Sequence, residues 1–199
     1  MTLRAGVVAV QGDVAEHAAA LDRAASAHDR DVDVHEIRAA GVLPDCDVAL
    51  VPGGESTTIS RFLHSEGIGD ELREHVADGK PVLATCAGLI VCARDARDDR
   101  VDELGVLDVA VERNAFGRQR DSFEAALDVV GLDDPFHAVF IRAPAIDAVG
   151  DDVTVLATVG DRPVAVRDGP IVATAFHPEL TDDARLHELA LFADRSARC

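Results

Sequence analysis

A cysteine lies at a turn where nucleophilic chemistry would be favoured. The segment LATCAGL carries Cys86 at the point where a short apolar run changes into a helical pattern. A nucleophile on such a turn projects its side chain, while the helix N-terminus supplies free N–H groups and a positive dipole. We therefore expect the thiol to ionise readily and the N–H of Ala87 to hold the oxyanion formed when an amide carbonyl is attacked. The alternative is that Cys86 is a small residue that fills a strand-to-helix junction.

A histidine and a glutamate two residues apart offer the base that such a thiol needs. In VATAFHPEL an apolar run ends at His177, and Pro178 and Glu179 follow in a rigid loop. His177 would take the thiol proton and later give it to the leaving amine, while Glu179 would fix the imidazole tautomer and favour the imidazolium. A lone histidine at a strand end is more often structural, but a His-x-Glu pair in a chain with a cysteine at an elbow favours catalysis.

Paired glycines follow another apolar run, in PGGEST at 52–57. Such a turn lets backbone N–H groups approach a ligand closely, so Gly54 is a candidate for the second oxyanion donor. An ordinary loop that ends in a Ser or Thr helix cap explains the same letters. The segment is not a phosphate-binding Walker loop, because it lacks the Gly-Lys-Ser/Thr ending.

Two arginines beside apolar segments are candidates for holding a substrate carboxylate. Arg113 lies in VERNAFGRQ at 111–119, and Arg142 lies in FIRAP at 140–144. A guanidinium fork is well shaped for a carboxylate. Each arginine can instead form an internal ion pair with one of the many acidic side chains, and this reading is the stronger for either residue alone.

Strand and helix patterns alternate through the first hundred residues. Strands are expected at 4–10, at 32–37 and within 47–54. Helices are expected over 12–25, where Asp13 is placed to cap the start, around 57–65 and around 69–78. Residues 80–96 have the pattern of a strand that turns into a helix at Cys86. This alternation predicts a mainly parallel sheet with both faces covered by helices.

The second half of the chain has a different pattern. Short β-branched segments predict strands joined by hairpins and turns near 105–112, 122–130, 136–142, 153–159, 163–168 and 171–176, and a final helix is expected at 182–195. No linker or repeat divides the chain. We therefore predict a single α/β domain over residues 1–199, with a mainly parallel central sheet and extra antiparallel strands in its second half.

Charge and cysteine spacing exclude several classes of function. The formal net charge of −18 argues against nucleic acid or an anionic membrane as a partner, since both require a cationic surface. No apolar run approaches the length of a membrane span, and the first residues do not resemble a secretory signal, so we expect a cytoplasmic protein. The four cysteines match neither a metal-binding pattern nor a disulfide framework, and we predict no metal.

Several motifs in order resemble one enzyme family. GVVAVQGDVAEH, PGGESTTISRFL, TCAGLI, GVLDVAVERNAFGRQRDSFE, FIRAP and FHPELTDDARLH are similar to the class I, or triad, glutamine amidotransferases, and within them to the glutaminase subunits of pyridoxal 5′-phosphate synthase. The cysteine elbow and the His-x-Glu pair occur in many triad amidotransferases, whereas PGGESTT, RNAFGRQ and FIRAP are more specific to the vitamin B6 branch. The resemblance implies a flavodoxin-like fold.

The resemblance also implies roles for individual residues and partners. Cys86 would be the nucleophile, with His177 and Glu179 completing the relay. The implied contacts to L-glutamine are Gly54, Glu55, Ser56, Arg113, Ile141 and Arg142. The glutaminase would use no cofactor, and its ammonia would pass to a separate synthase subunit in a hetero-oligomeric complex. We further hypothesise that QGDVAEH and its helix form part of the docking face and help to shape the oxyanion loop.

Two departures and three alternatives accompany this resemblance. Ala84 stands where amidotransferase elbows commonly have glycine, and the charged segment at 29–47 is longer than in other members. One alternative is the amidotransferase subunit of another pathway, such as imidazole glycerol phosphate synthesis. Another is a hydrolase or chaperone of the DJ-1 type, which would not need the His-x-Glu pair. The third is an inactive subunit that only stabilises a synthase.

Overall fold

A seven-stranded sheet forms the centre of the computed structural model, which describes residues 2–113 and 122–192. The strand order is β10-β11-β12-β4-β3-β1-β2. Five neighbouring strands are parallel: β1 (Leu3–Val8), β2 (Val32–Ile37), β3 (Val48–Val51), β4 (Val82–Thr85) and β12 (Ile171–Thr174). Two antiparallel strands, β11 (Arg162–Asp168) and β10 (Thr154–Val159), extend the sheet beyond β12.

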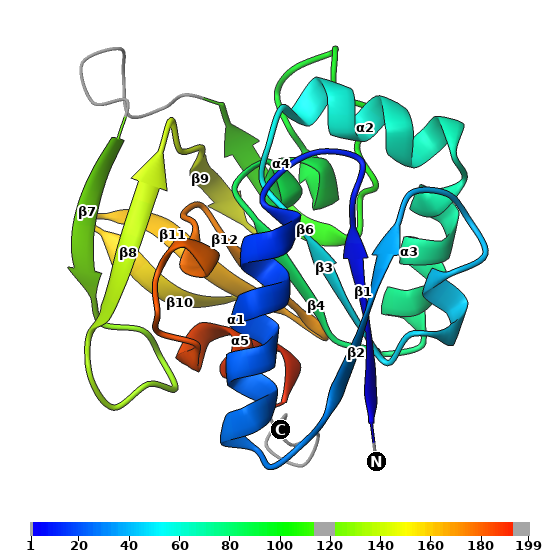
Figure 1. Ribbon diagram of the computed structural model, residues 1–199. Helices are drawn as coiled ribbons and strands as arrows, with labels where there is room; N and C mark the ends of the chain where they lie inside the picture. The colour runs from blue at the N-terminus through cyan, green and yellow to red at the C-terminus, as the bar shows by residue number, and fades with distance from the viewer. Residues whose placement is uncertain (1, 114–121, 193–199) are drawn as a thin grey trace.

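Two smaller sheets lie beside the central one (Figure 1). The first joins β5 (Ala93–Asp95), β6 (Leu107–Glu112) and β9 (Ala145–Val149). The second is an antiparallel pair of β7 (Ser122–Leu127) and β8 (Phe136–Ile141). The expected α/β class, with a mainly parallel sheet and extra antiparallel strands in the second half, is confirmed.

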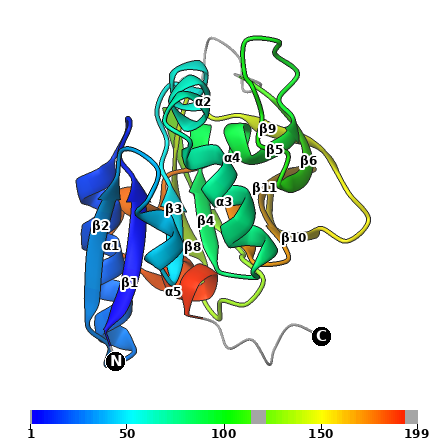
Figure 2. The same ribbon diagram turned by 90° about the vertical axis from the view of Figure 1, so that its right-hand side faces the viewer.

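Helices cover both faces of the central sheet. They are α1 (Val14–Ala27), α2 (Ser56–Ser65), α3 (Ile68–Ala77), α4 (Ala87–Cys92) and α5 (Arg185–Leu191), with short 3₁₀ turns η1 (Leu43–Asp45) and η2 (Pro178–Leu180). Helices α1 and α5 pack against each other, whereas α3 and α4 lie on the opposite side of the sheet from α1 (Figure 2). Every residue of β3, β4 and β12 is buried, as expected for parallel strands covered on both faces.

Some sequence expectations about individual elements were wrong. The helix after Cys86 ends at Cys92, and its expected continuation forms β5. Strand β9 was not predicted; it begins directly after Pro144. The last helix begins at Arg185 instead of 182, and residues 193–199 lie outside the described part.

The parallel strands bring distant loops to one edge of the sheet. The carboxyl ends of β1, β3, β4 and β12 lie side by side, with Thr85 of β4 opposite Thr174 of β12 and Ala84 opposite Val51 of β3. Ala84, the departure noted at the elbow, is fully buried in this register. The segments that follow these strands therefore meet, and they carry the QGD, PGGES, Cys86 and His177 motifs. Among the described residues, no helix is long and apolar enough to cross a membrane.

Candidate active site

Cys86 lies on a strained turn between β4 and α4. Its backbone has φ 50° and ψ −104°, a left-handed conformation that a residue with a side chain rarely adopts. The turn is fixed because Cys86 N–H donates to the Thr174 carbonyl at 2.8 Å. Strain of this kind concentrates at functional sites, where surrounding structure holds it in place. The side chain is only 8% exposed, and Sγ lies 4.0 Å from the Ile141 carbonyl oxygen.

His177 and Glu179 form a buried hydrogen-bonded pair. Nδ1 of His177 lies 2.7 Å from Oε1 of Glu179, and the glutamate side chain is inaccessible to solvent. With Nδ1 engaged by the carboxylate, Nε2 is the nitrogen left to exchange a proton with Cys86. Gly53 lies against both residues, since a Cβ there would stand 2.7 Å from His177 Cε1 and 3.4 Å from Cys86 Cβ. A side chain at position 53 would push the two apart.

The surroundings favour the charged form of His177. Burial by itself lowers the pKa of His177, but hydrogen bonds to the Cys86 and Glu179 side chains outweigh it and raise the pKa to about 10. Burial raises the pKa of Glu179, and the hydrogen bond from His177 opposes that rise. The arrangement therefore suits an imidazolium held between the cysteine sulfur and a carboxylate.

The raised pKa of His177 should make folding stability depend on pH. Because the folded-state pKa lies above the ordinary value of 6.5, the stabilisation is fully present below pH 6.5 and is lost as pH rises toward about 10. We expect the thermal midpoint of the native chain to fall more steeply over this interval than that of a His177→Gln variant, measured by calorimetry. Parallel curves for the two proteins would show that His177 is not the group responsible.

The loop after β3 lies beside the cysteine turn. Gly54 has φ 138°, a conformation that requires glycine. Glu55 N–H donates to Gln11 Oε1 at 2.9 Å, and the Glu55 carboxylate accepts from Thr58 N–H at 3.0 Å. Glu55, rather than a Ser or Thr, is therefore the cap of α2. The Ser56 hydroxyl is buried without a hydrogen-bond partner among the described residues.

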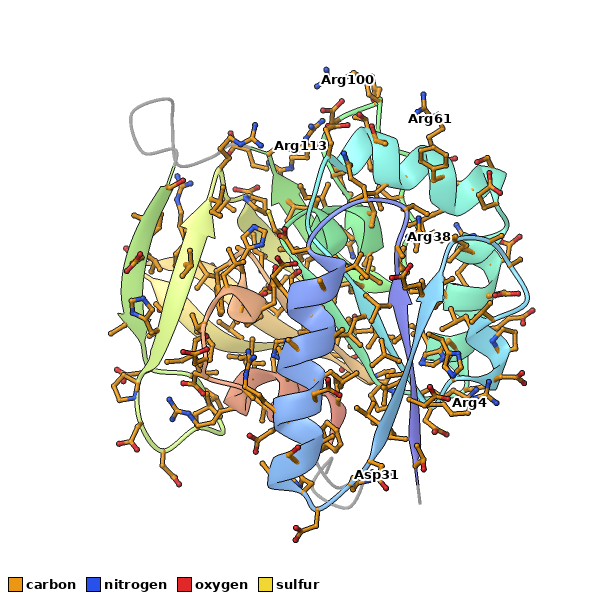
Figure 3. All side chains as sticks on the ribbon, in the orientation of Figure 1. Arg4, Asp31, Arg38, Arg61, Arg100 and Arg113 are labelled. Atoms are coloured by element: carbon orange, nitrogen blue, oxygen red, sulfur yellow. The ribbon has the colours of Figure 1, made fainter. Side chains whose placement is uncertain are left out.

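The two candidate arginines differ in their partners. Arg113 forms ion pairs with Glu55, at 3.1 Å, and with Asp98, so the alternative of an internal ion pair holds for this residue. Arg142 has φ 44° and no hydrogen bond or ion pair with any residue that the structure describes. Figure 3 shows Arg113 near the same edge of the molecule as Arg100 and Arg61, whereas Asp31 lies at the opposite end.

One cavity of about 470 Å³ brings these residues together. It is lined by Gln11, Asp13, Gly54, Glu55, Ser56, Cys86, Ala87, Ile90, Arg113, Ile141, Arg142 and His177. All the candidate site residues line it except Glu179, which is buried behind His177.

Three lining residues, Gln11, Asp13 and Ile90, were not predicted as site residues, although QGDVAEH was expected to shape the oxyanion loop. Asp13 was expected to cap α1, but its side chain makes no capping hydrogen bond, and its Oδ2 lies 3.6 Å from His177 Nδ1. The available signal was that QGD follows β1 at the edge where the other motifs lie.

Three residues at the site lie close enough together to be considered as metal ligands. Asp13, His177 and Glu179 each offer one ligand atom within 4.8 Å of one another. A metal bound to His177 Nδ1 would displace its hydrogen bond to Glu179. The other two described cysteines, Cys46 and Cys92, are buried in the core. Cys199 and most of RNAFGRQ lie outside the described residues.

Comparison with known proteins finds relatives along almost the whole chain. The SNO glutamine amidotransferase family matches residues 7–194. A protein of Halorubrum lacusprofundi, named pyridoxal 5′-phosphate synthase subunit PdxT, is 70% identical over 193 residues, covering 97% of this chain and 98% of that relative. A protein of Haloarcula marismortui with the same name is 72% identical over 192 residues, covering 96% of this chain and 98% of that relative.

Solved structures agree on the fold. A crystal structure described as a glutamine amidotransferase has a TM-score of 0.82 at 45% identity, and the match covers 93% of this chain and 95% of that one. A chain in the structure of PurLQS from Thermotoga maritima, with a TM-score of 0.65 and 20% identity over 90% of this chain and 89% of that one, shares the fold alone. The predicted class I, flavodoxin-like fold is therefore confirmed.

Proposed function

This chain belongs to the SNO glutamine amidotransferase family, and on that premise we propose that it hydrolyses L-glutamine to L-glutamate and ammonia, with Cys86 as the nucleophile. The observation that carries the proposal is that a cysteine on a strained elbow and a buried His–Glu pair meet at one cavity. An activated nucleophile requires a base within reach and a third group that orients the base. Cys86, His177 and Glu179 have the chemistry and placement for these three roles.

The proposed reaction begins with transfer of the Cys86 proton to His177. The thiolate attacks the side-chain amide carbon of glutamine, and the oxyanion is held by the N–H groups of Ala87 and Gly54. His177 then gives its proton to the leaving nitrogen, so ammonia departs and a thioester remains on Cys86. Water, deprotonated by His177, attacks the thioester, and collapse of this second intermediate releases glutamate and restores the thiol. Glu179 keeps the imidazole in the required tautomer throughout.

The cavity also offers groups for the two charged groups on the α-carbon of glutamine. Arg142 has a guanidinium without a partner among the described residues, which supports its assignment to the α-carboxylate. Arg113 would contribute while remaining paired with Glu55, whose carboxylate is suited to the α-amino group. The buried Ser56 hydroxyl and the exposed Ile141 side chain would complete the contacts.

We propose that the chain is the glutaminase subunit of a pyridoxal 5′-phosphate synthase and passes its ammonia to a separate synthase subunit. The names of the relatives at 70% and 72% identity support this role. We also propose that residues 1–199 form one amidotransferase domain.

Contacts of the residues just before α1 support the hypothesis that QGDVAEH helps to shape the oxyanion loop. Gln11 accepts from the N–H of Glu55, and a Cβ on Gly12 would collide with the carbonyl oxygen of Gly53. A synthase subunit that docks on the start of α1 would therefore press directly on the loop that carries Gly54.

The test is glutamate and ammonia release from glutamine by the purified chain, with and without its cognate synthase subunit. We expect turnover in the presence of the partner, and thioester chemistry predicts that hydroxylamine will trap the acyl group as a hydroxamate. A folded complex that leaves glutamine untouched would overturn the proposal and return attention to the inactive-subunit alternative.

A further inference from the structure

A cluster of buried polar side chains lies behind Glu179, on the side away from the cavity. It consists of His17 on α1, Thr85 at the end of β4 and His187 on α5, and each of the three is 0% exposed. None of them lines the cavity. Polar side chains that are completely buried normally have hydrogen-bond partners, and here the three side chains bond to one another while His17 also lies beside Glu179.

His17 lies beside both the cysteine turn and the His177–Glu179 pair. Its Nε2 lies 3.1 Å from Oγ1 of Thr85, the residue before Cys86. The same nitrogen lies 3.5 Å from Oε2 of Glu179. This second carboxylate oxygen is buried and has no hydrogen-bond partner among the described residues, so the imidazole N–H that faces it is its nearest polar neighbour among the contacts described. On the other side of the ring, His17 Nδ1 lies 3.3 Å from Nε2 of His187.

Only one tautomer of His17 suits these contacts. Burial, with His187 and His177 nearby, lowers the pKa of His17 well below 6.5, and burial, with Arg23 nearby, lowers the pKa of His187 to about 3. Both rings are therefore neutral, and each carries one N–H. A proton on His17 Nε2 faces Thr85 and the Glu179 carboxylate, whereas a lone pair there would face a negative oxygen. His17 Nδ1 then accepts from His187 Nε2–H.

We propose that His17 is a positioning residue of the site, whose Nε2–H, fixed by His187, holds Glu179 from behind and keeps its other oxygen on His177. This inference rests on the proposed glutaminase function, because it assigns His17 a role in presenting the base. It also ties the strand that carries Cys86 to the loop that carries Glu179 through one imidazole. Loss of that ring would loosen the carboxylate and, through it, His177.

The charged and titratable groups that face this chain of contacts are few. Asp13, just before α1, faces His177, and Arg23 on α1 lies near His187. Cys86 faces His177 from the elbow, and Glu179 lies between the two imidazoles. His17 can therefore act on the reactive thiol through Glu179 and His177, or through Thr85, which directly precedes Cys86.

The test measures Cys86 reactivity directly and does not need glutamine. The full chain, His17→Leu and His17→Gln are alkylated with iodoacetamide over a range of pH, and modification of Cys86 is followed by mass spectrometry. Leucine removes the donor, whereas glutamine keeps an N–H near the position of Nε2. The matched control is His75→Leu, which removes another buried histidine, bonded to the Pro81 carbonyl at 3.3 Å and remote from the cavity.

For His17→Leu, we expect the acid limb of the alkylation profile to move up by about one pH unit, because the buried carboxylate loses the N–H that faces its second oxygen. In the glutaminase assay with the synthase subunit, kcat should fall about 10- to 100-fold with little change in KM, because a misplaced base affects the chemical step. His17→Gln and His75→Leu should keep the native profile.

An unchanged profile in a folded His17→Leu protein, or an equal shift in His75→Leu, would overturn the inference. Should the leucine variant not fold, His17→Gln is compared with His17→Asn, whose shorter amide does not reach the position of Nε2; only asparagine should shift the profile, and equal behaviour would count against the role. The alkylation result stands even where no glutamine is hydrolysed, so failure of this inference is distinguishable from failure of the proposed function.

Discussion

Replacing Cys86 with alanine is expected to reduce glutamine hydrolysis by the chain and its synthase subunit about 10⁴- to 10⁶-fold, as is usual when a covalent nucleophile is removed. No other cysteine among the described residues reaches the cavity. The fold should survive, because the side chain that is lost is small and lies at a turn held by the backbone bond from Cys86 N–H to the Thr174 carbonyl. Glutamate release, measured beside circular dichroism of the same samples, checks both statements.

The matched control for this substitution is Cys92→Ala. Cys92 lies at the end of α4, is completely buried, and has its pKa raised to about 12 by that burial. Its thiol is therefore inert, and we expect its removal to leave turnover within about twofold of the native chain. Full activity in Cys86→Ala, or a comparable loss in both variants, would show that the elbow cysteine is not the nucleophile.

Gly88→Ala is expected to destabilise the protein by about 3 kcal/mol, toward the upper end of what overpacking costs. A methyl group at this position would fall on the carbonyl oxygen of Val51, which belongs to the backbone of β3 and cannot rotate away. The helix α4 would have to move off the sheet, and the elbow would move with it. Chemical denaturation and glutamate release should therefore show lower stability and lower activity together.

Gly69→Ala provides the corresponding control. Gly69 is the second residue of α3, as Gly88 is the second residue of α4. A Cβ at position 69 would meet the Leu104 side-chain atom Cδ2 at 2.9 Å, and that flexible end can turn aside. We expect a change in stability below about 1 kcal/mol, since alanine also favours the helix. Similar behaviour of the two variants would contradict the close packing of α4 on β3.

Local patterns were sufficient to predict the elements that present the site. The abrupt changes from apolar run to glycine pair at 52–54 and from strand to helix at Cys86 are each visible within ten residues. The parallel arrangement of β3, β4 and β12 then brings the two turns and His177 together. The prediction failed where tertiary contacts override a local signal, as at β9, where a strand follows Pro144 and pairs with β6.

Contacts between distant residues explain what remained hidden in the site. Gln11 is 44 positions from its partner Glu55, so the resemblance linked QGDVAEH to the oxyanion loop but could not identify this hydrogen bond. The side chain that the Asp13 carboxylate faces, His177, is also distant in sequence, so the placement of Asp13 at a helix start predicted only a cap. The burial of His17 could have been predicted, because His17 shares helical spacing with the buried residues Ala20, Leu21, Ala24 and Ala25.

Strand β4, which leads into the turn at Cys86, is the fourth of seven in the central sheet and is bordered by β3 and β12. Local opening of a sheet begins at its margins, where strands have a neighbour on only one side, and here the margins are β2 and β10. Amide hydrogens near the elbow should therefore exchange with solvent more slowly than those at either margin. Local opening of the outer strands would leave the relative positions of the proposed nucleophile and base unchanged.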